Sequence, residues 1–330
     1  MTFFSIVIPV YNISSYLDDA VGSILRQRFK DFELILVDDG STDGSEHICN
    51  LYASNHDYVK VIHKANGGPS SARNAGIRAA RGEYLVFLDG DDVLCENALH
   101  EMYLAVLEYG RPDLILGTVI QWSHRSQRHT RNDRYRMMQK SMHLMDICVE
   151  YTKNGELPPW APYSTIYNLN YLRRLRICYE ERWNCAEDCA FFMSLVLENP
   201  SFVLVGFPFV KVRIDRGGSI TRQLTYWAIR SQLEAFAFVF DSCKKKMAPQ
   251  ELQSFFAQCF MNVMNQVGML NDDSEFHDCM ALVRERSDIL ASVPQSIRNI
   301  IMRDICVILG MERGIRCLGK VRRVIRGTGL

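Results

Sequence analysis

The first part of the chain alternates short apolar runs with segments of mixed polarity. Four runs, FSIVIPV, FELILVD, VKVIH and YLVFLD, are rich in β-forming residues and nearly continuously apolar. Such runs are typical of strands that are buried on both faces of a sheet. A fifth run, DLILGTVIQW, follows at 113–122. Strands that alternate with helices predict an open, doubly wound and mainly parallel α/β sheet.

The segments between the runs have the spacing of amphipathic helices. Leu17, Val21 and Ile24 share one helical face, and Ser15 with Asp18 has the form of a capping box, so we expect a helix to begin near Ser15. Between residues 70 and 80 the apolar positions are mostly alanine and glycine. Side chains this small predict a helix that packs closely on the sheet.

The pattern changes after residue 222. From 223 to 330 it is helical, with aromatic and methionine stripes that we assign to core packing. The chain is therefore expected to consist of an α/β domain over 1–222 and a helical C-terminal region over 223–330.

Charge and cysteine content narrow the class of protein. The 38 Lys and Arg residues balance 38 Asp and Glu residues, so the whole molecule has no electrostatic attraction for nucleic acid. The eleven cysteines are scattered and odd in number, which predicts free thiols in a reducing cytoplasm. The sequence opens directly on a strand, without a charged leader, so we expect no secretory signal.

Polar residues gather after each predicted strand. Tyr11 and Asn12 follow the first run, DDGSTD ends the second, NGGPSSARNAG follows the third, and Asp89, Asp91 and Asp92 end the fourth. In doubly wound sheets, ligands bind at the carboxyl ends of the strands. These segments therefore predict one crevice with an aromatic ring, a glycine-rich backbone, an arginine and a carboxylate cluster. A nucleoside diphosphate with a hard divalent cation fits this combination.

The three carboxylates within four residues need a positive partner. Like charges at close range cost on the order of a kcal/mol per pair even near water. Acids clustered at the end of a buried strand have no structural purpose without a counter-ion. The other features have ordinary explanations, since DDGSTD suits a turn or helix cap and Arg73 suits a solvated helix surface. Their joint occurrence in this order is what predicts a binding site.

The segments SIVIPVYN, LILVDDGSTDGS, NGGPSSARNAGI and YLVFLDGDD resemble the successive signature segments of the family-2 glycosyltransferases. Members of that family are inverting enzymes of the GT-A fold, and the resemblance is to the type that builds bacterial surface polysaccharides. It is close over residues 3–115 and looser to about residue 222. It implies a nucleotide-sugar-binding half over 1–115 and an acceptor-side half over 116–222.

The resemblance implies a role for each motif residue. Asp91 would bind Mn²⁺ or Mg²⁺, Asp89 would meet the ribose or the water shell of the metal, and Asp92 is an additional acid near them. The other nucleotide-site residues would be Pro9 and Tyr11 at the base, Asp39 at the uracil N–H, which favours a uridine nucleotide, and Asn66 and Arg73 beside base and phosphate.

The segment NCAEDCAFF resembles the Glu-Asp segment of the family, which contains Glu187 and would place the catalytic base at Asp188. From the residues alone, Asp188 is better explained as an acid that caps the following helix. A helix N-terminus also stabilises a carboxylate and so weakens it as a base. The role is compatible with this if the acceptor proton moves late, while a metal neutralises the departing diphosphate.

Three further residues are candidates for substrate contact. Trp160 would form a wall for the acceptor sugar, or would otherwise pack in the core. In RIDRGGSIT, Arg213 or Arg216 would reach the diphosphate from a lid, although a surface hairpin explains the same residues.

Residues 296–330 hold eight Arg or Lys residues against Asp304 and Glu312. This composition suits a segment in a membrane interface, where each basic residue near anionic lipid gains about 1 kcal/mol. The alternative is a closing helix that packs on the protein itself. On a helix, one face would carry Arg313, Arg316, Lys320 and Arg323, and another would carry Ile315, Leu318, Val321 and Ile325.

Three other classes of protein are less consistent with the sequence. A dinucleotide-dependent oxidoreductase needs G-x-G-x-x-G after the first strand, where this chain has PVYNISSY. An aspartate-dependent phosphohydrolase needs a nucleophilic Asp within residues 9–12, which contain none. A catalytically inactive nucleotide-binding or scaffold protein of the same fold stays as the alternative.

We therefore predict a metal-dependent, inverting hexosyl- or N-acetylhexosaminyltransferase. It would use a nucleotide-diphosphate donor of the UDP-sugar type and a glycan or lipid-linked acceptor. It would act in the cytoplasm or on the inner face of the cell membrane, without contact with nucleic acid.

Overall fold

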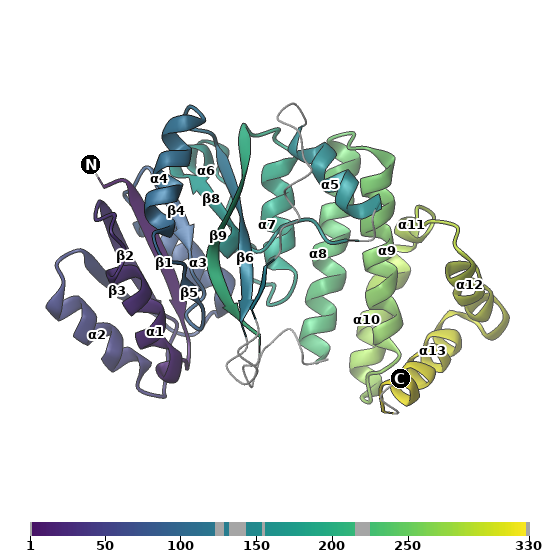
Figure 1. Cartoon of the computed structure of the whole chain (residues 1–330). Helices are drawn as coiled ribbons and strands as arrows, with labels where there is room; N and C mark the ends of the chain where they lie inside the picture. Colours follow the sequence, from purple (N-terminus) through teal and green to yellow (C-terminus); the bar gives the residue numbers. More distant parts are fainter. Residues whose placement is uncertain (1, 123–128, 132–142, 154–155, 215–224, 328–330) are drawn as a thin grey trace. The chain divides into compact units, whose positions relative to one another are not determined.

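Each of the five apolar runs forms a strand, and the five strands belong to one sheet (Figure 1). Their bounds are β1 Phe4–Val10, β2 Phe32–Asp38, β3 Val59–His63, β4 Tyr84–Phe87 and β6 Leu114–Trp122. This computed structural model describes residues 2–122, 129–131, 143–153, 156–214 and 225–327. Within those residues the sheet has nine strands in the order β3-β2-β1-β4-β8-β6-β9-β5, and β7 pairs with β6.

The sheet is parallel in one half and mixed in the other. The parallel half consists of four strands in the order β3-β2-β1-β4, and each neighbouring pair among them is parallel. The remaining strands are β5 Val93–Leu94, β7 His129–Arg131, β8 Thr165–Asn168 and β9 Phe202–Arg213. Strand β8 is antiparallel to β4 and β6, and β5 is antiparallel to β9, whereas β6 and β9 are parallel. The predicted α/β class is confirmed, and the parallel order holds in the half that carries the motifs.

Helices pack on both faces of the parallel half. Ile6 of β1 shares a core with Leu17 of α1 and Leu99 of α4. Val7 points to the opposite face, where α3 approaches so closely that a Cβ on Gly76 would lie 2.3 Å from Cγ1 of Val7. The small side chains of α3 are what permit this approach. The helical elements of this part are α1 Ser14–Leu25, α2 Ser45–Asn55, α3 Gly68–Ala79, α4 Ala98–Glu108, the 3₁₀ turn η2 Pro162–Ser164 and α6 Leu169–Leu175.

Helix α1 begins at Ser14, and the predicted capping box at Ser15 is wrong. The Asp43 carboxylate, in the loop after β2, accepts a hydrogen bond from the backbone N–H of Ser14 at 2.8 Å. Ser45 Oγ accepts one from the N–H of Ile13 at 3.0 Å. The acceptors for the start of α1 therefore come from the loop after β2 and from the first residue of α2, instead of from α1 itself.

The described chain groups into two compact units, whose positions relative to one another are not determined. The sheet lies in the first unit. Two internal segments of the predicted α/β domain belong to the second unit. The first unit consists of Met1–Ile147, Pro159–Glu181 and Glu198–Gly217, and the second of Cys148–Pro158, Arg182–Leu197 and Gly218–Leu330.

The C-terminal region is helical, as predicted. Phe240, Phe256 and Met261, from the aromatic and methionine stripes, are buried in its core. None of the helices in the described residues has the length and apolar character that crossing a membrane requires. The helices of the second unit are α7 Glu187–Val196, α8 Tyr226–Lys245, α9 Gln250–Val267, α10 Asp273–Glu285, α11 Ser287–Leu290, α12 Ile297–Leu309 and α13 Met311–Gly327, and α5 Leu144–Lys153 has residues in both units.

Candidate functional site

The loops after β1 and β2 are tied together at the carboxyl edge of the sheet. The N–H of Asp39 donates to the carbonyl of Val10 at 2.9 Å, and the N–H of Thr42 donates to Oδ1 of Asn12 at 2.8 Å. Asn12 has a φ of +51°, in the left-handed region that asparagine tolerates better than most residues. This turn leaves Tyr11 48% exposed at the edge where ligands of such sheets bind.

The carboxylate of Asp39 anchors the glycine-rich loop that follows β3. It is buried, and it accepts hydrogen bonds from the N–H of Gly67 at 3.0 Å and the N–H of Gly68 at 2.8 Å. Lys64 Nζ donates to the same carboxylate. Asn66 lies exposed in this loop. Because a carboxylate has about four acceptor positions, these three donors leave about one for a ligand.

Arg73 and Asp89 form an ion pair within the site. Nη2 of Arg73 donates to Oδ1 of Asp89 at 3.1 Å, and the two side chains are 8% and 30% exposed. The Arg73 guanidinium also lies over the ring of Tyr179, 5.4 Å from its centroid. Arg73 is therefore not a solvated helix charge, and it is one of the positive partners that the three carboxylates require.

Residues 89–92, which we call the acidic turn, fold tightly against the end of β1. A Cβ on Gly90 would lie 2.1 Å from Cδ1 of Ile13 and 3.2 Å from the carbonyl oxygen of Pro9, so a larger residue here would have to displace the Ile13 side chain. The N–H of Asp92 donates to the carbonyl of Asp89 at 2.9 Å and closes the turn. Pro9 is partly buried in β1, and the turn packs directly on it.

The three carboxylates of the turn have different environments. Asp89 and Asp91 are partly exposed, whereas Asp92 is 3% exposed. Burial, together with the charges of Asp89 and Asp91, raises the pKa of Asp92 to about 8, against a lowering contribution from the N–H of Arg213. That N–H donates to Oδ1 of Asp92 at 2.9 Å. Asp92 thus belongs to the protein interior, and the other two acids lie where a ligand can reach them.

The carboxylates of the turn fit a cation that is bound together with a diphosphate. Among the described residues, no group of three or more His, Cys, Asp or Glu side chains is arranged to hold a metal ion. A hard cation such as Mg²⁺ usually takes one or two carboxylates from the protein and its other ligands from substrate phosphates and water. The partly exposed pair of Asp89 and Asp91 matches such an incomplete set, and does not match a preformed metal cage.

The remaining candidates of the first unit have different positions. Trp160 is partly buried, shortly before the turn η2. Arg213 ends β9, and its Nε donates to the carbonyl oxygen of Asp91 at 3.1 Å, so its side chain lies on the acidic turn. Arg216 lies outside the described residues.

Asp188 belongs to the second unit, where it is the second residue of α7. Its Oδ1 accepts a hydrogen bond from the N–H of Cys189 at 2.7 Å, and Glu187 beside it is buried. Ala186, just before the helix, has a φ of +62°. A non-glycine residue held there costs on the order of 1–3 kcal/mol, and such residues cluster at functional sites. Asp188 and the carboxylates of Asp89, Asp91 and Asp92 therefore belong to different units of the chain.

Two residues of the site were not selected by the sequence pattern. Lys64 directly follows β3, and a basic residue at that strand end was a usable signal. Tyr179, under Arg73, is held through its backbone by Asn74, whose Oδ1 accepts the Tyr179 N–H at 2.8 Å and whose Nδ2 donates to the Tyr179 carbonyl at 2.9 Å. No local motif marks Tyr179, because it lies 105 positions after Asn74.

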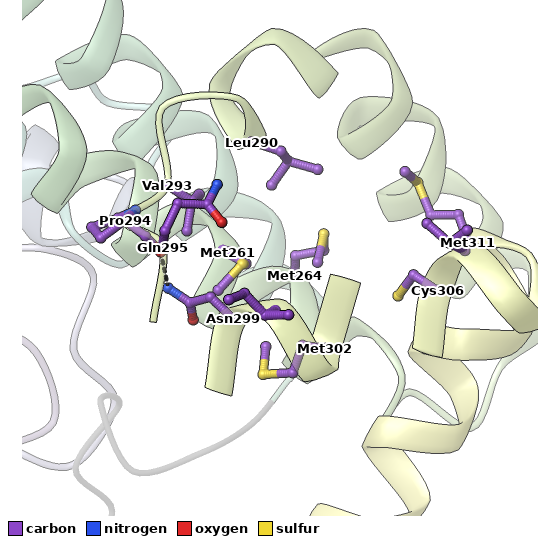
Figure 2. Close-up of a pocket in the computed structure, with 12 residues that line it drawn as sticks. Met261, Met264, Leu290, Val293, Pro294, Gln295, Asn299, Met302, Cys306 and Met311 are labelled. Atoms are coloured by element: carbon purple, nitrogen blue, oxygen red, sulfur yellow. Dashed lines mark hydrogen bonds between the residues drawn. The ribbon is translucent and has the colours of Figure 1, made fainter. Parts of the chain in front are cut away.

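The second unit contains an apolar cavity of about 200 Å³ (Figure 2). Methionine, aliphatic and proline side chains of α9, α11, α12, α13 and residues 293–294 line most of it, and Gln295 and Asn299 are polar neighbours. Three consecutive aliphatic residues at the end of α12 face solvent, since Val307 is 74%, Ile308 80% and Leu309 44% exposed.

Helix α13 packs against the rest of the second unit, over the residues whose side chains the structure describes. A Cβ on Gly319 would lie 2.2 Å from the carbonyl carbon of Gly268, at the end of α9. Ile315 is fully buried, and Arg316 pairs with Asp273. Ile315 and Arg316 therefore face the protein, as the alternative of a closing helix predicts for them.

Comparison with known proteins places these segments in a family. The family model described as glycosyl transferase family 2 matches residues 5–199. The glycosyltransferase GlyG of Streptococcus pneumoniae is 42% identical over 114 residues, which are 34% of this chain and 38% of that protein. The minor teichoic acid biosynthesis protein GgaA of Bacillus subtilis is 31% identical over 230 residues, 66% of this chain and 49% of that protein. The chain thus spans about half or less of the length of these two relatives.

The fold also resembles solved structures. S. aureus TarS 1-349 in complex with UDP-GlcNAc matches with a TM-score of 0.71 at 19% identity, over 97% of this chain and 91% of that one. This likeness supports the fold alone. The family model covers more than half of the chain. The residues that it matches include the acidic turn, the glycine-rich loop and the Glu-Asp segment. The chain belongs to glycosyl transferase family 2.

Proposed function

We propose that the protein transfers a sugar from a uridine-diphosphate donor to a hydroxyl of a glycan or lipid-linked acceptor, in the synthesis of a surface polysaccharide. The proposal rests on the site at the carboxyl edge of β1, β2 and β4. This edge carries three features that come from separate sequence motifs: the exposed Tyr11, the loop anchored by Asp39, and the Arg73–Asp89 ion pair. GgaA, named for minor teichoic acid biosynthesis, supports the choice of a cell-surface polymer as product.

The donor would bind with its base against Pro9 and Tyr11. Asp39 would accept the uracil N–H at the acceptor position that the glycine-rich loop leaves open. Asn66 would contact the base side of the nucleotide, and Arg73 would lie near base and phosphate. The structures of TarS with UDP and with UDP-GlcNAc support a uridine nucleotide as the first donor to test.

Asp91 and Asp89 would hold Mn²⁺ or Mg²⁺ together with the diphosphate. A cation bound there would neutralise the negative charge that develops on the departing diphosphate. The ion pair with Arg73 fixes the direction of Asp89, and the turn at Gly90 fixes the backbone that carries Asp91. The mannosyltransferase PcManGT of Pyrobaculum calidifontis, solved with GDP-Man and Mn²⁺, supports testing Mn²⁺ first.

Asp188 would accept the proton of the acceptor hydroxyl. The hydroxyl oxygen forms the new glycosidic bond as the bond from the anomeric carbon to the diphosphate breaks, so one in-line displacement inverts the configuration. A carboxylate in the first turn of a helix is a weak base, so its proton transfer belongs late in the step. The left-handed backbone of Ala186 supports a functional role for this segment.

We also propose an anionic membrane as a partner of the tail, residues 296–330. Val307 and Ile308 would enter the interface, and the exposed Arg313 and Lys320 would lie near anionic headgroups. The protein would then act in the cytoplasm, in part on the inner face of the cell membrane.

A panel of nucleotide sugars tests the proposal. Slow donor hydrolysis and thermal stabilisation would be measured for UDP-, GDP- and dTDP-sugars with Mn²⁺. We expect uridine donors to stabilise the protein and to be hydrolysed. Stabilisation without hydrolysis or transfer to any acceptor would favour the alternative, an inactive nucleotide-binding or scaffold protein, and no response to any nucleotide would reject the donor site.

A further inference from the structure

Arg213 lies at the centre of the contacts that surround the acidic turn. Its Nε donates to the carbonyl oxygen of Asp91 at 3.1 Å, and its backbone N–H donates to Oδ1 of Asp92 at 2.9 Å. Its Nη2 donates to Oδ2 of Asp19, on α1, at 3.1 Å. One residue therefore contacts two of the three acidic positions and joins them to a neighbouring helix.

Two aromatic rings lie against the Arg213 guanidinium. Its central carbon lies 4.4 Å from the ring centroid of Trp122 and 5.0 Å from that of Tyr16. The Arg213 side chain is only 6% exposed. Stacking of this kind is favourable and directional for a planar guanidinium. Because Trp122 ends β6 and Tyr16 lies on α1, two further elements determine where the guanidinium points.

The backbone connects the same two regions. Val93 and Leu94, directly after the acidic turn, pair with Lys211 and Val210 of β9, the strand that ends in Arg213. A ladder of two residues provides few hydrogen bonds for holding a turn whose carboxylates repel one another. The side chain of Arg213 adds a hydrogen bond to the turn and a positive charge beside it.

We propose that Arg213 is a positioning residue, which holds the turn so that the carboxylates of Asp89 and Asp91 are arranged in advance for the cation of the donor complex. This inference rests on the proposed metal-dependent transfer. It differs from a lid arginine that touches the diphosphate, because the guanidinium is already engaged by protein groups at Nε, at Nη2 and at two aromatic rings. Lysine would keep the charge but would lose the planar fork and the stacking.

Calorimetry of UDP binding, with Mn²⁺ and with EDTA, separates these roles. In Arg213→Met we expect the Mn²⁺-dependent gain in UDP affinity to fall about tenfold or more, since a charge-assisted hydrogen bond and the order it imposes are lost. UDP affinity in EDTA should be unchanged. Arg213→Lys should recover only part of the gain. The electron paramagnetic resonance signal of free Mn²⁺, in the presence of UDP, provides a second readout that needs no turnover.

Three outcomes would overturn the inference. An equal loss of affinity in EDTA would indicate direct contact with the diphosphate or a general structural role. A Mn²⁺-dependent gain that Arg213→Met retains would show that the turn needs no such support. Full recovery in Arg213→Lys would show that charge alone matters.

A matched variant controls for folding and for charge. Arg78→Met removes an arginine of α3 whose side chain is 66% exposed. This variant should keep the Mn²⁺-dependent gain. If Arg213→Met does not fold, Trp122→Leu removes one stacking face and should lower the gain in the same direction. A wild-type protein without any Mn²⁺-dependent gain would reject the proposed function, and with it this inference.

Discussion

The guanidinium of Arg73 lies 3.1 Å from the carboxylate of Asp89, so the glycine-rich motif and the acidic motif meet in one ion pair. Arg213 approaches the same turn from β9. The protein therefore offsets the repulsion among three neighbouring carboxylates partly with its own arginines. Asp89 and Asp91 stay partly exposed despite these contacts, which is the condition that a bound cation requires.

Replacement of Arg73 by methionine should weaken donor binding. Asp89 would lose a partner that is almost buried, which costs about 1–3 kcal/mol. We expect UDP affinity, measured by calorimetry, to fall by about tenfold or more. Arg78→Met, on the same helix but largely exposed, is the matched control. Equal UDP affinity in the two variants would contradict a role for the ion pair in the nucleotide site.

Asp91→Asn removes one negative ligand and keeps the shape of the side chain. Diphosphate departure would lose its main electrostatic support, worth several kcal/mol, so turnover should fall by orders of magnitude. Mn²⁺-dependent UDP binding should weaken as well. The exposed acid Asp57 provides a control in Asp57→Asn. Activity that persists in Asp91→Asn and resists EDTA would exclude this cation site.

Asp188→Asn should abolish transfer and leave donor binding nearly intact, because the proposed base acts on the acceptor. Steady-state rates and UDP calorimetry on the same preparation measure the two properties separately. A collapse of donor affinity along with turnover would make Asp188 a structural or nucleotide-site residue. Retained transfer in this variant would assign the base elsewhere.

Asp43→Ala should destabilise the first unit. The carboxylate accepts hydrogen bonds from Ser14 and Ser45 at the starts of two helices, and losing such a cap costs about 1 kcal/mol. Burial raises the pKa of Asp43, but hydrogen bonds from Ser45 and Ser14 outweigh it and lower the pKa from 3.8 to about 2. Thermal melts of the variant and the wild type would measure the difference.

The effect of Asp43 should depend on pH in one direction. The pKa of the Asp43 carboxyl is lower in the folded protein than in the unfolded chain, so its charged form stabilises the folded protein when the pH is above the unfolded pKa. This stabilisation is lost as the pH falls through the pKa of the folded protein. The difference in melting temperature between wild type and Asp43→Ala should therefore be complete at neutral pH and shrink below about pH 4. A difference that grows on acidification would contradict the capping role. Asp57→Ala, which removes another exposed acid, should show neither effect.

Vesicle co-sedimentation tests the membrane proposal. The full chain should sediment with phosphatidylglycerol vesicles at low salt and less at high salt, because surface charges are screened. Replacing the exposed Val307 and Ile308 by serine should reduce binding, whereas Leu51→Ser, a 53% exposed position on α2, should not. If the wild type stays in the supernatant at low salt, or all variants sediment alike, the tail does not contact membrane.

The sequence determined the strands, the helical C-terminal region and the edge of the sheet where the motifs collect. Strand bounds such as Phe4–Val10 and Phe32–Asp38 coincide with the apolar runs, because burial on both faces leaves a continuous local signal. The motif order then placed Tyr11, Asp39 and Asp89 at one edge, since parallel strands share their carboxyl ends. Their roles in binding and catalysis stay predictions.

Only the tertiary structure decided which groups are paired. Arg213 reaches a turn 122 positions away, Tyr179 supports Arg73 from outside any motif, and Asp43 caps a helix that Ser15 was expected to cap. Local periodicity reports which face of an element is apolar, but it has no information on which distant side chain fills a given gap. The partner of a charge depends on packing between segments far apart in sequence, and so the burial of Asp92 and the stacking of Arg213 appear only when those segments meet.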